Sequence, residues 1–209
     1  MTFPIEVVLE ANIAGGKTTC LESLERDGFH VVYEAIEDWT PLLNLFYQDK
    51  KRWAFALQMK ILNHFENHRK KSVPETSLVR VWERSPISTK YIFADMLKAA
   101  DQFDDAEYNL YLDYWRQSEL KVDMCIYIRT DPDIVIERLR ERNGDEDRNI
   151  DNAYLRAVHD RHEAVFGKSN KVIIVDGNQS PEKVSRDIAV IIQSAIKEAS
   201  TSDLLQLNC

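Results

Sequence analysis

The sequence predicts an α/β protein in which a five-stranded parallel sheet is flanked by helices. Two observations support this fold class. Five short apolar segments rich in β-branched residues alternate with longer segments in which apolar residues recur every three or four positions. Such alternation is the pattern of parallel strands joined by right-handed crossovers. A chain of 209 residues, 44% of them hydrophobic, can fill the core of one such domain and is too short for two of ordinary size.

The expected elements follow one another in regular order. We expect strands at 5–9, 29–33, 77–82, 124–128 and 171–176. We expect helices at about 17–26, 41–47, 51–70, 87–98, 104–118, 132–142, 151–166 and 181–198. Gly28 should follow the end of the first helix, and Thr40 with Pro41 should cap and start the second. We assign residues 1–199 to one domain and residues 200–209 to a flexible C-terminal tail.

The segment Ala11–Thr19 is typical of a phosphate-binding loop. It lies between an expected strand and an expected helix, which is the context that such a loop needs, although an ordinary turn with two glycines is the alternative. The strict pattern has glycine where this chain has Ala11. Lys17 would contact the β- and γ-phosphates, and Thr18 would reach Mg²⁺. The residues expected to contact the nucleotide are Asn12, Ile13, Ala14, Gly15, Gly16, Lys17, Thr18 and Thr19.

Composition narrows the classes of function. A formal net charge of −8 argues against a protein that binds nucleic acid through its phosphates. No apolar run reaches membrane length, and Cys20, Cys125 and Cys209 follow no metal-site or disulfide spacing. Because the first expected strand begins at residue 5, we expect no targeting peptide before it. We therefore predict a cytoplasmic protein without a nucleic-acid or membrane partner.

Charged side chains follow two expected strands at the loop side of the sheet. Glu34 could accept the proton of an acceptor hydroxyl, and Glu83 could bind Mg²⁺ directly or through water. Arg84 could hold Glu34 ionised or contact the acceptor oxygen. Ordinary polarity at strand ends would explain one such residue, but three at convergent strand ends indicate a site for phosphoryl transfer.

The expected helix at 132–142 carries an arginine cluster. Arg138, Arg140 and Arg142, with Arg148 beyond them, suit a clamp on phosphate because guanidinium groups bind phosphate bidentately. A solvated helix face is the alternative interpretation. The polar segment that follows extends this cluster into a lid, expected at about 138–149.

Together these segments resemble the deoxyribonucleoside kinase family. The resemblance is carried by 3–19, Glu34 with Trp39, Tyr47, Gln58, 83–85, the arginine-rich lid at 138–148, Tyr154-Leu155 and His159. It covers nearly the whole chain and implies a P-loop nucleoside-kinase-like fold that uses ATP and Mg²⁺. It also implies transfer of the γ-phosphoryl group of ATP to the 5′-hydroxyl of a deoxynucleoside, and a homodimer formed through helices near 51–70.

The resemblance assigns a catalytic role to individual positions. Glu34 resembles the general base that takes the proton of the 5′-hydroxyl. Arg84 resembles the arginine that orients this hydroxyl, and Glu83 resembles the Mg²⁺ ligand beside Thr18. Lys17 completes the catalytic set through the phosphates.

Further positions resemble the residues that bind the nucleoside. Gln58 resembles the amide that pairs with the base edge, since one amide offers both a donor and an acceptor. Phe93 resembles the ring that stacks on the base, and Trp39 resembles a wall of the pocket. Tyr47 and an acid of the lid resemble the pair that binds the sugar 3′-hydroxyl. That acid is most simply Asp147, with Glu146 as its neighbour.

Two further positions bear on the choice of base. Family members that favour cytosine and purines carry an arginine and an aspartate deep in the pocket, where this chain has Phe65 and Thr89. The apolar Phe65 resembles the members that prefer pyrimidines or accept many bases. The resemblance therefore favours thymidine and deoxycytidine as substrates.

Three other functions share part of this pattern. A nucleoside-monophosphate kinase of the thymidylate kinase type would need an additional arginine clamp for the phosphate of its acceptor. A GTP-binding switch would need an Asn-Lys-x-Asp motif, which the sequence lacks. A non-catalytic nucleotide-binding protein would not depend on Glu34. The first and the third of these functions stay open at this point.

Overall fold

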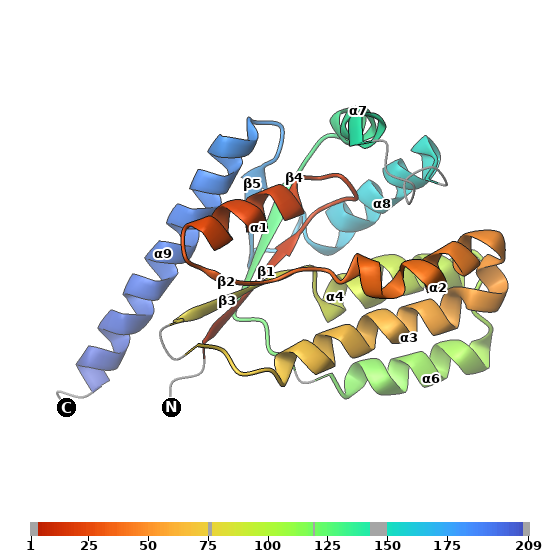
Figure 1. Cartoon of the computed structure of the whole chain (residues 1–209), viewed down its shortest axis with the longest axis horizontal. Helices are drawn as coiled ribbons and strands as arrows, with labels where there is room; N and C mark the ends of the chain where they lie inside the picture. Colours follow the sequence, from red (N-terminus) through yellow and green to blue (C-terminus); the bar gives the residue numbers. More distant parts are fainter. Residues whose placement is uncertain (1–3, 75–76, 119, 143–149, 207–209) are drawn as a thin grey trace.

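The computed structural model describes residues 4–74, 77–118, 120–142 and 150–206 (Figure 1). The described part of the chain contains one five-stranded sheet with the order β2-β3-β1-β4-β5, in which every pair of neighbours is parallel. The strands are β1 (Ile5–Glu10), β2 (His30–Val32), β3 (Val79–Glu83), β4 (Met124–Arg129) and β5 (Val172–Asp176). The predicted fold class is confirmed.

Helices connect and cover the strands. The helices before β4 are α1 (Lys17–Arg26), α2 (Ile36–Gln48), α3 (Lys50–Arg69), α4 (Pro86–Ser88), η1 (Thr89–Ala94), α5 (Asp95–Ala99) and α6 (Asp105–Arg116). The helices after β4 are α7 (Pro132–Arg142), α8 (Asn152–Val165) and α9 (Pro181–Gln206). None of the described helices combines the length and the apolar composition needed to cross a bilayer.

The two faces of the sheet are buried under different helices. Val7 and Leu9 of β1 pack in a cluster with α1 and α9, while Val8 between them packs in a second cluster with α3, η1 and α8. This opposite placement follows from the alternation of side chains along a strand. In Figure 1 α1 and α9 lie beside each other against the sheet, and α2, α3 and α6 extend away from it as a layer of helices.

Three element boundaries differ from the prediction. α2 begins at Ile36, so Thr40 and Pro41 lie inside the helix and do not start it; Pro41 removes only one hydrogen bond, to the carbonyl of residue 37. The helix expected at 87–98 is divided, because η1 is a π-helical segment between α4 and α5. α9 continues through Gln206 into the segment expected to be a tail. The assignment of residues 1–199 to one domain stays a prediction.

A buried ion pair ties α3 to the sheet. Arg80 of β3 lies opposite Glu6 of β1, and its Nε is 3.0 Å from Glu6 Oε2. Its Nη1 also donates to the carbonyl of His68, at 3.3 Å, in the last turn of α3. Terminal helix carbonyls lack partners within the helix, so Arg80 supplies a cap as well as a charge partner.

Candidate active site

The phosphate loop joins the buried end of β1 to the first turn of α1. Gly16 has a φ of 97°, a left-handed conformation that glycine adopts without a steric penalty. Gly15 allows the close turn, because a Cβ there would lie 2.8 Å from the Cβ of Ala11. Ala11 itself is fully buried in the core cluster beneath α1 and has no positive φ. The departure from glycine at this position therefore places a methyl group in the protein interior.

Lys17 is buried at the start of α1. Its Nζ lies 3.2 Å from the carbonyl oxygen of Asn12. Burial, and next the positive charge of Arg84, lower the pKa of Lys17 to about 8. The amide of Asn12 holds the loop from below, since its Nδ2 donates to the carbonyl of Leu155 at 2.9 Å and its Oδ1 accepts from the N–H of Ile13. The loop thus presents its backbone and a cation toward the same space.

The structure brings the two expected metal ligands together. Glu83 ends β3, and its Oε1 accepts a hydrogen bond of 2.8 Å from the hydroxyl of Thr18. Its other oxygen accepts from the backbone N–H of Glu34 at 3.2 Å. Oxygen donors of this kind are those that Mg²⁺ prefers. Glu83 therefore links the phosphate loop to the strand end that carries Glu34.

Arg84 and Glu34 form a largely buried ion pair beside the phosphate loop. Arg84 Nε lies 3.1 Å from the carboxylate of Glu34, and Arg84 Nη1 donates to the carbonyl of Ala11 at 3.1 Å. The guanidinium carbon also lies 4.8 Å from the centre of the Phe93 ring. The side chains of the pair are 7% and 14% exposed, so the carboxylate is held in place and still reaches the cavity.

A cavity of about 1010 Å³ contains most of the predicted substrate residues. Those that line it are Glu34, Trp39, Tyr47, Gln58, Arg84, Thr89 and Phe93. Gln58 is 3% exposed, and its Oε1 has no hydrogen-bond partner among the described residues. A buried acceptor without a partner is costly, so this oxygen fits a ligand that donates a hydrogen bond. Leu57 and Ile61 of α3 and Phe93 of η1 add apolar side chains to the lining.

Comparison with known proteins identifies the family. The sequence model of the deoxynucleoside kinase family matches residues 7–197. The chain belongs to the deoxynucleoside kinase family. It is 33% identical to a fowlpox virus protein named "probable deoxycytidine kinase" over 79% of this chain and 73% of that protein. It is 30% identical to human mitochondrial thymidine kinase 2 over 85% of this chain and 72% of that protein. It is 29% identical to chicken deoxycytidine kinase 2 over 80% and 76% of the two chains.

As a member of this family the protein is an ATP-dependent deoxynucleoside kinase. One end of the cavity is the phosphate loop, and of the loop residues expected to contact the nucleotide, those from Ile13 to Thr19 line it. Asn12 is buried behind the loop, where it supports the backbone. The other end is formed by Gln58 and its apolar neighbours. Arg84 of the ion pair contacts both the carbonyl of Ala11 at the loop and the ring of Phe93.

The arginines of α7 are placed differently from one another. Arg138 and Arg142 line the cavity, and Arg138 Nη2 donates to the carbonyl of Gly177 at 3.0 Å. Arg140 is exposed and is not among the described residues of the lining. Helix geometry explains this, because residues four apart share a face and the residue midway between them points away. The lid acids Glu146 and Asp147 lie outside the described residues.

Two further placements were not anticipated. Phe65 is fully buried and its ring centre is 6.1 Å from that of Trp82, so it belongs to the core and not to the lining of the cavity. Tyr154 of α8, by contrast, lines the cavity, and burial raises its pKa to about 12. In the sequence, Tyr154 was noted only as part of the Tyr154-Leu155 pair that resembles the kinase family. Loop residues Gly177 and Gln179 also reach the cavity, from a segment without a recognisable motif.

Proposed function

We propose that this kinase transfers the γ-phosphoryl group of ATP to the 5′-hydroxyl of a deoxynucleoside, with Glu34 as the general base. The main support is the position of the Glu34 carboxylate, 3.1 Å from Arg84 and in the cavity that also contains the phosphate loop. A base must lie within hydrogen-bond reach of the proton that it removes. Arg84 keeps the carboxylate oriented through this ion pair.

The acceptor side supports a nucleoside as the substrate. We assign the base edge to Gln58, the stacking surface to Phe93 and a wall of the pocket to Trp39, while Tyr47 with Asp147 or Glu146 would bind the sugar. The unpartnered Oε1 of Gln58 accepts one hydrogen bond from a base, and its amide nitrogen donates another. Thymine and cytosine both offer the complementary pair.

The preference for thymidine and deoxycytidine rests on the side chains near Gln58. Thr89 is uncharged, and its hydroxyl donates to the carbonyl of Ser85 at 3.0 Å. Ile61, Leu97 and Phe93 add apolar surface to this end of the cavity. Positions 65 and 89 carry phenylalanine and threonine in place of the arginine and aspartate of members that favour cytosine and purines, which supports the pyrimidine preference. We keep Phe65 in this proposal only as a residue behind the pocket.

The phosphate side supports Mg²⁺ as the cofactor. Thr18 and Glu83 would hold the ion, which would neutralise charge on the phosphates of ATP. Lys17, Arg138 and Arg142 would bind the phosphate oxygens from the loop and from α7. Arg140 would join them only through a movement of the lid, since it points away from the cavity in this structure.

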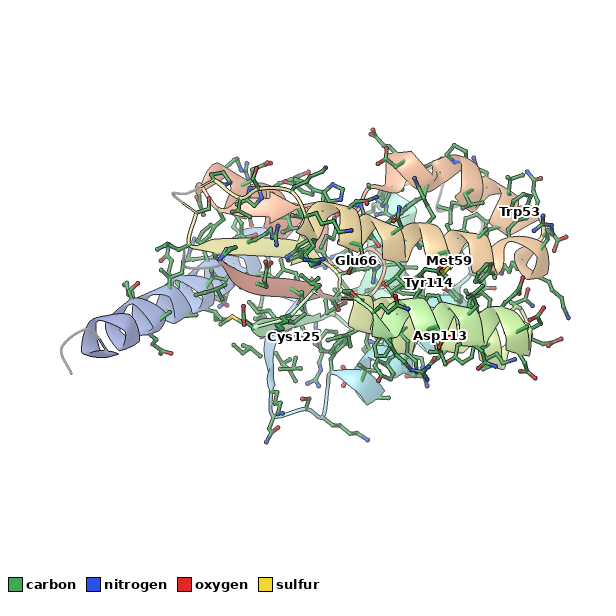
Figure 2. All side chains as sticks on the ribbon, turned by 90° about the horizontal axis from the view of Figure 1, so that it is seen from below. Trp53, Met59, Glu66, Asp113, Tyr114 and Cys125 are labelled. Carbon is green, nitrogen blue, oxygen red and sulfur yellow. The ribbon has the colours of Figure 1, made fainter. Side chains whose placement is uncertain are left out.

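We also propose a homodimer that joins the α3 and α6 faces of two chains. Figure 2 shows α3 with Met59 and Glu66 beside α6 with Asp113 and Tyr114. Leu110 and Tyr114 on α6 are 47% and 51% exposed and lie four residues apart, so they share one face of the helix. The cytoplasmic location stays a prediction.

The first prediction concerns the base. Glu34→Gln keeps the size of the side chain and removes its ability to accept a proton, so we expect kcat to fall about 100-fold or more while ATP still binds. The measurement is phosphotransfer from ATP to each of the four deoxynucleosides and their monophosphates. Glu37→Gln, an exposed change on the same helix entry, is the matched control and should keep full activity.

Each outcome of this experiment has a defined meaning. Turnover of monophosphates alone would replace the proposal with a nucleoside-monophosphate kinase. Full activity of Glu34→Gln would remove Glu34 from the role of base. Equal turnover of purine and pyrimidine nucleosides would contradict the proposed preference without affecting the reaction.

A further inference from the structure

Glu10 is a fully buried carboxylic acid for which the mechanism above has no role. It ends β1 immediately before the phosphate loop and is 0% exposed. Its Oε1 accepts a hydrogen bond from the hydroxyl of Ser85, and its Oε2 has no partner among the described residues. Burial raises its pKa to about 7. A carboxyl group in the core destabilises a fold unless it is paired, so its contact with Ser85 calls for an explanation.

Three consecutive residues of β1 and the loop hold the corner that follows β3. The carbonyl of Leu9 accepts from the N–H of Arg84 at 3.0 Å, and the carbonyl of Ala11 accepts from Arg84 Nη1 at 3.1 Å. Between them, the side chain of Glu10 binds Ser85. Glu10 therefore supplies the side-chain contact in a set of three that fixes residues 84 and 85 against the first strand.

This corner needs such support. Arg84 has a φ of 64°, a left-handed conformation that is unfavourable for any residue with a Cβ. With its backbone in this conformation, Arg84 places its Nε 3.1 Å from the carboxylate of Glu34. Without fixed neighbours the corner could relax to an ordinary conformation, and the guanidinium would move with it.

The hydroxyl of Ser85 is fully used. It donates its single proton to Glu10 and accepts from the N–H groups of Ile87 and Ser88, at 3.1 and 3.4 Å, as the N-cap of α4. A hydroxyl has one proton and two lone pairs, so this arrangement satisfies it completely. Without the acceptor on Glu10, the hydroxyl proton of Ser85 would lack its hydrogen-bond partner. The hydroxyl could then rotate, which would weaken its hydrogen bonds to the N–H groups of Ile87 and Ser88 at the N-cap of α4.

We propose that Glu10 is a positioning residue for phosphoryl transfer, which acts through Ser85 to hold Arg84 against Glu34. This inference rests on the proposed function, because it presumes that Arg84 takes part in the reaction. A catalytic group that is displaced by about 1 Å can lose about 100-fold in rate. The loss is expected in kcat, since the phosphate loop and the base pocket are left intact.

The test is a double-mutant cycle between Glu10 and Arg84. Glu10→Ala should lower kcat about 10- to 100-fold and change the KM for ATP less than about threefold. In the Arg84→Ala background the same change should have no further effect on kcat. Glu10→Gln keeps an acceptor oxygen for Ser85 and should restore kcat to within about threefold of the wild type. Ile192→Ala, which opens a cavity in the core under α9, controls for lost stability and should keep kcat when assayed well below its unfolding temperature.

Several results would overturn the inference. An equal loss from Glu10→Ala in both backgrounds would show that Glu10 does not act through Arg84, and a loss in Glu10→Gln as large as in Glu10→Ala would exclude the acceptor role. Should Glu10→Ala fail to fold, Ser85→Ala removes the same contact from the other side and enters the same cycle. Full activity of Arg84→Ala would instead contradict the proposed function.

Discussion

The Lys17 ammonium shows how the fold sets the chemistry of a single residue. It is buried between the phosphate loop and Arg84, and both burial and the neighbouring charge favour its neutral form. A triphosphate would reverse this balance, because its negative charge favours the protonated ammonium. Lys17 is therefore expected to gain a proton when ATP binds at alkaline pH.

The expected size of this effect follows from the pKa of about 8 in the free protein. At pH 8.5 binding of a non-hydrolysable ATP analogue should take up about 0.8 proton, and at lower pH the share that Lys17 contributes should vanish as the free ammonium becomes protonated. Calorimetry in buffers with different heats of ionisation measures the uptake. Lys17→Arg stays charged at every pH and should abolish it. Absence of uptake by the wild type at pH 8.5 would mean that Lys17 keeps its ordinary pKa.

The positions of some side chains were predicted correctly from the sequence, and those of others were not. Residues within compact motifs, such as Lys17, Glu34 and Glu83, lie where the sequence placed them, because a short loop and two strand ends leave little freedom. Phe65 and Arg140 do not, because a helix turns by about 100° per residue and an error of one position moves a side chain to another face. Their placement depends on how α3 and α7 are rotated against the sheet.

At the scale of elements, α3 depends on its anchor in the sheet. It carries Gln58 into the cavity, and its last turn is capped by Arg80, which also pairs with Glu6. Trp82, two positions beyond Arg80 on the same face of β3, donates to the same carboxylate. The network fixes the end of α3 relative to β1 and β3.

Breaking this anchor should destabilise the protein. Arg80→Met leaves the carboxylate of Glu6 buried without its charge partner and the end of α3 without its cap, so we expect a loss of about 3 kcal/mol in the free energy of unfolding. Urea denaturation measures it. The double variant Glu6→Gln with Arg80→Met should recover part of the loss, because no unpaired charge remains. Lys51→Ala, at an exposed ion pair, is the control and should change little. An equally small effect of Arg80→Met would contradict the anchoring role.

Elements were well predicted where a periodic pattern was long. The helices at 17–26 and 132–142 and all five strands lie close to their expected positions. The entry to α2 and the π-helical segment η1 were not anticipated. A proline usually starts a helix, and a π-helix has no distinct pattern of its own, so local signals pointed elsewhere. η1 places Thr89 and Phe93 in the cavity, which ties this irregular segment to the site.

At the scale of the whole molecule, the α3 and α6 face stands at the end away from α9 (Figure 1). The apolar side chains of Leu110 and Tyr114 on α6 are exposed on this face. Burial between two copies would remove them from water and add stability.

Charging this face should therefore dissociate the proposed homodimer. Leu110→Glu and Tyr114→Lys together should convert a particle of two chains into one of a single chain, as measured by size-exclusion chromatography with light scattering. Val190→Glu on α9, where Val190 is 56% exposed, is the matched control and should leave the mass unchanged. A wild-type protein that stays a single chain at high concentration would contradict the proposed dimer.

The sequence by itself determined the fold class, the phosphate loop and the family, because these depend on patterns within short segments. Only the tertiary structure decided the order of the strands, which face of α7 lines the cavity, and the contact of Glu10 with Ser85. Glu10 and Ser85 are 75 residues apart. No local pattern can report that they meet, since their contact exists only once β1 and β3 pair in register.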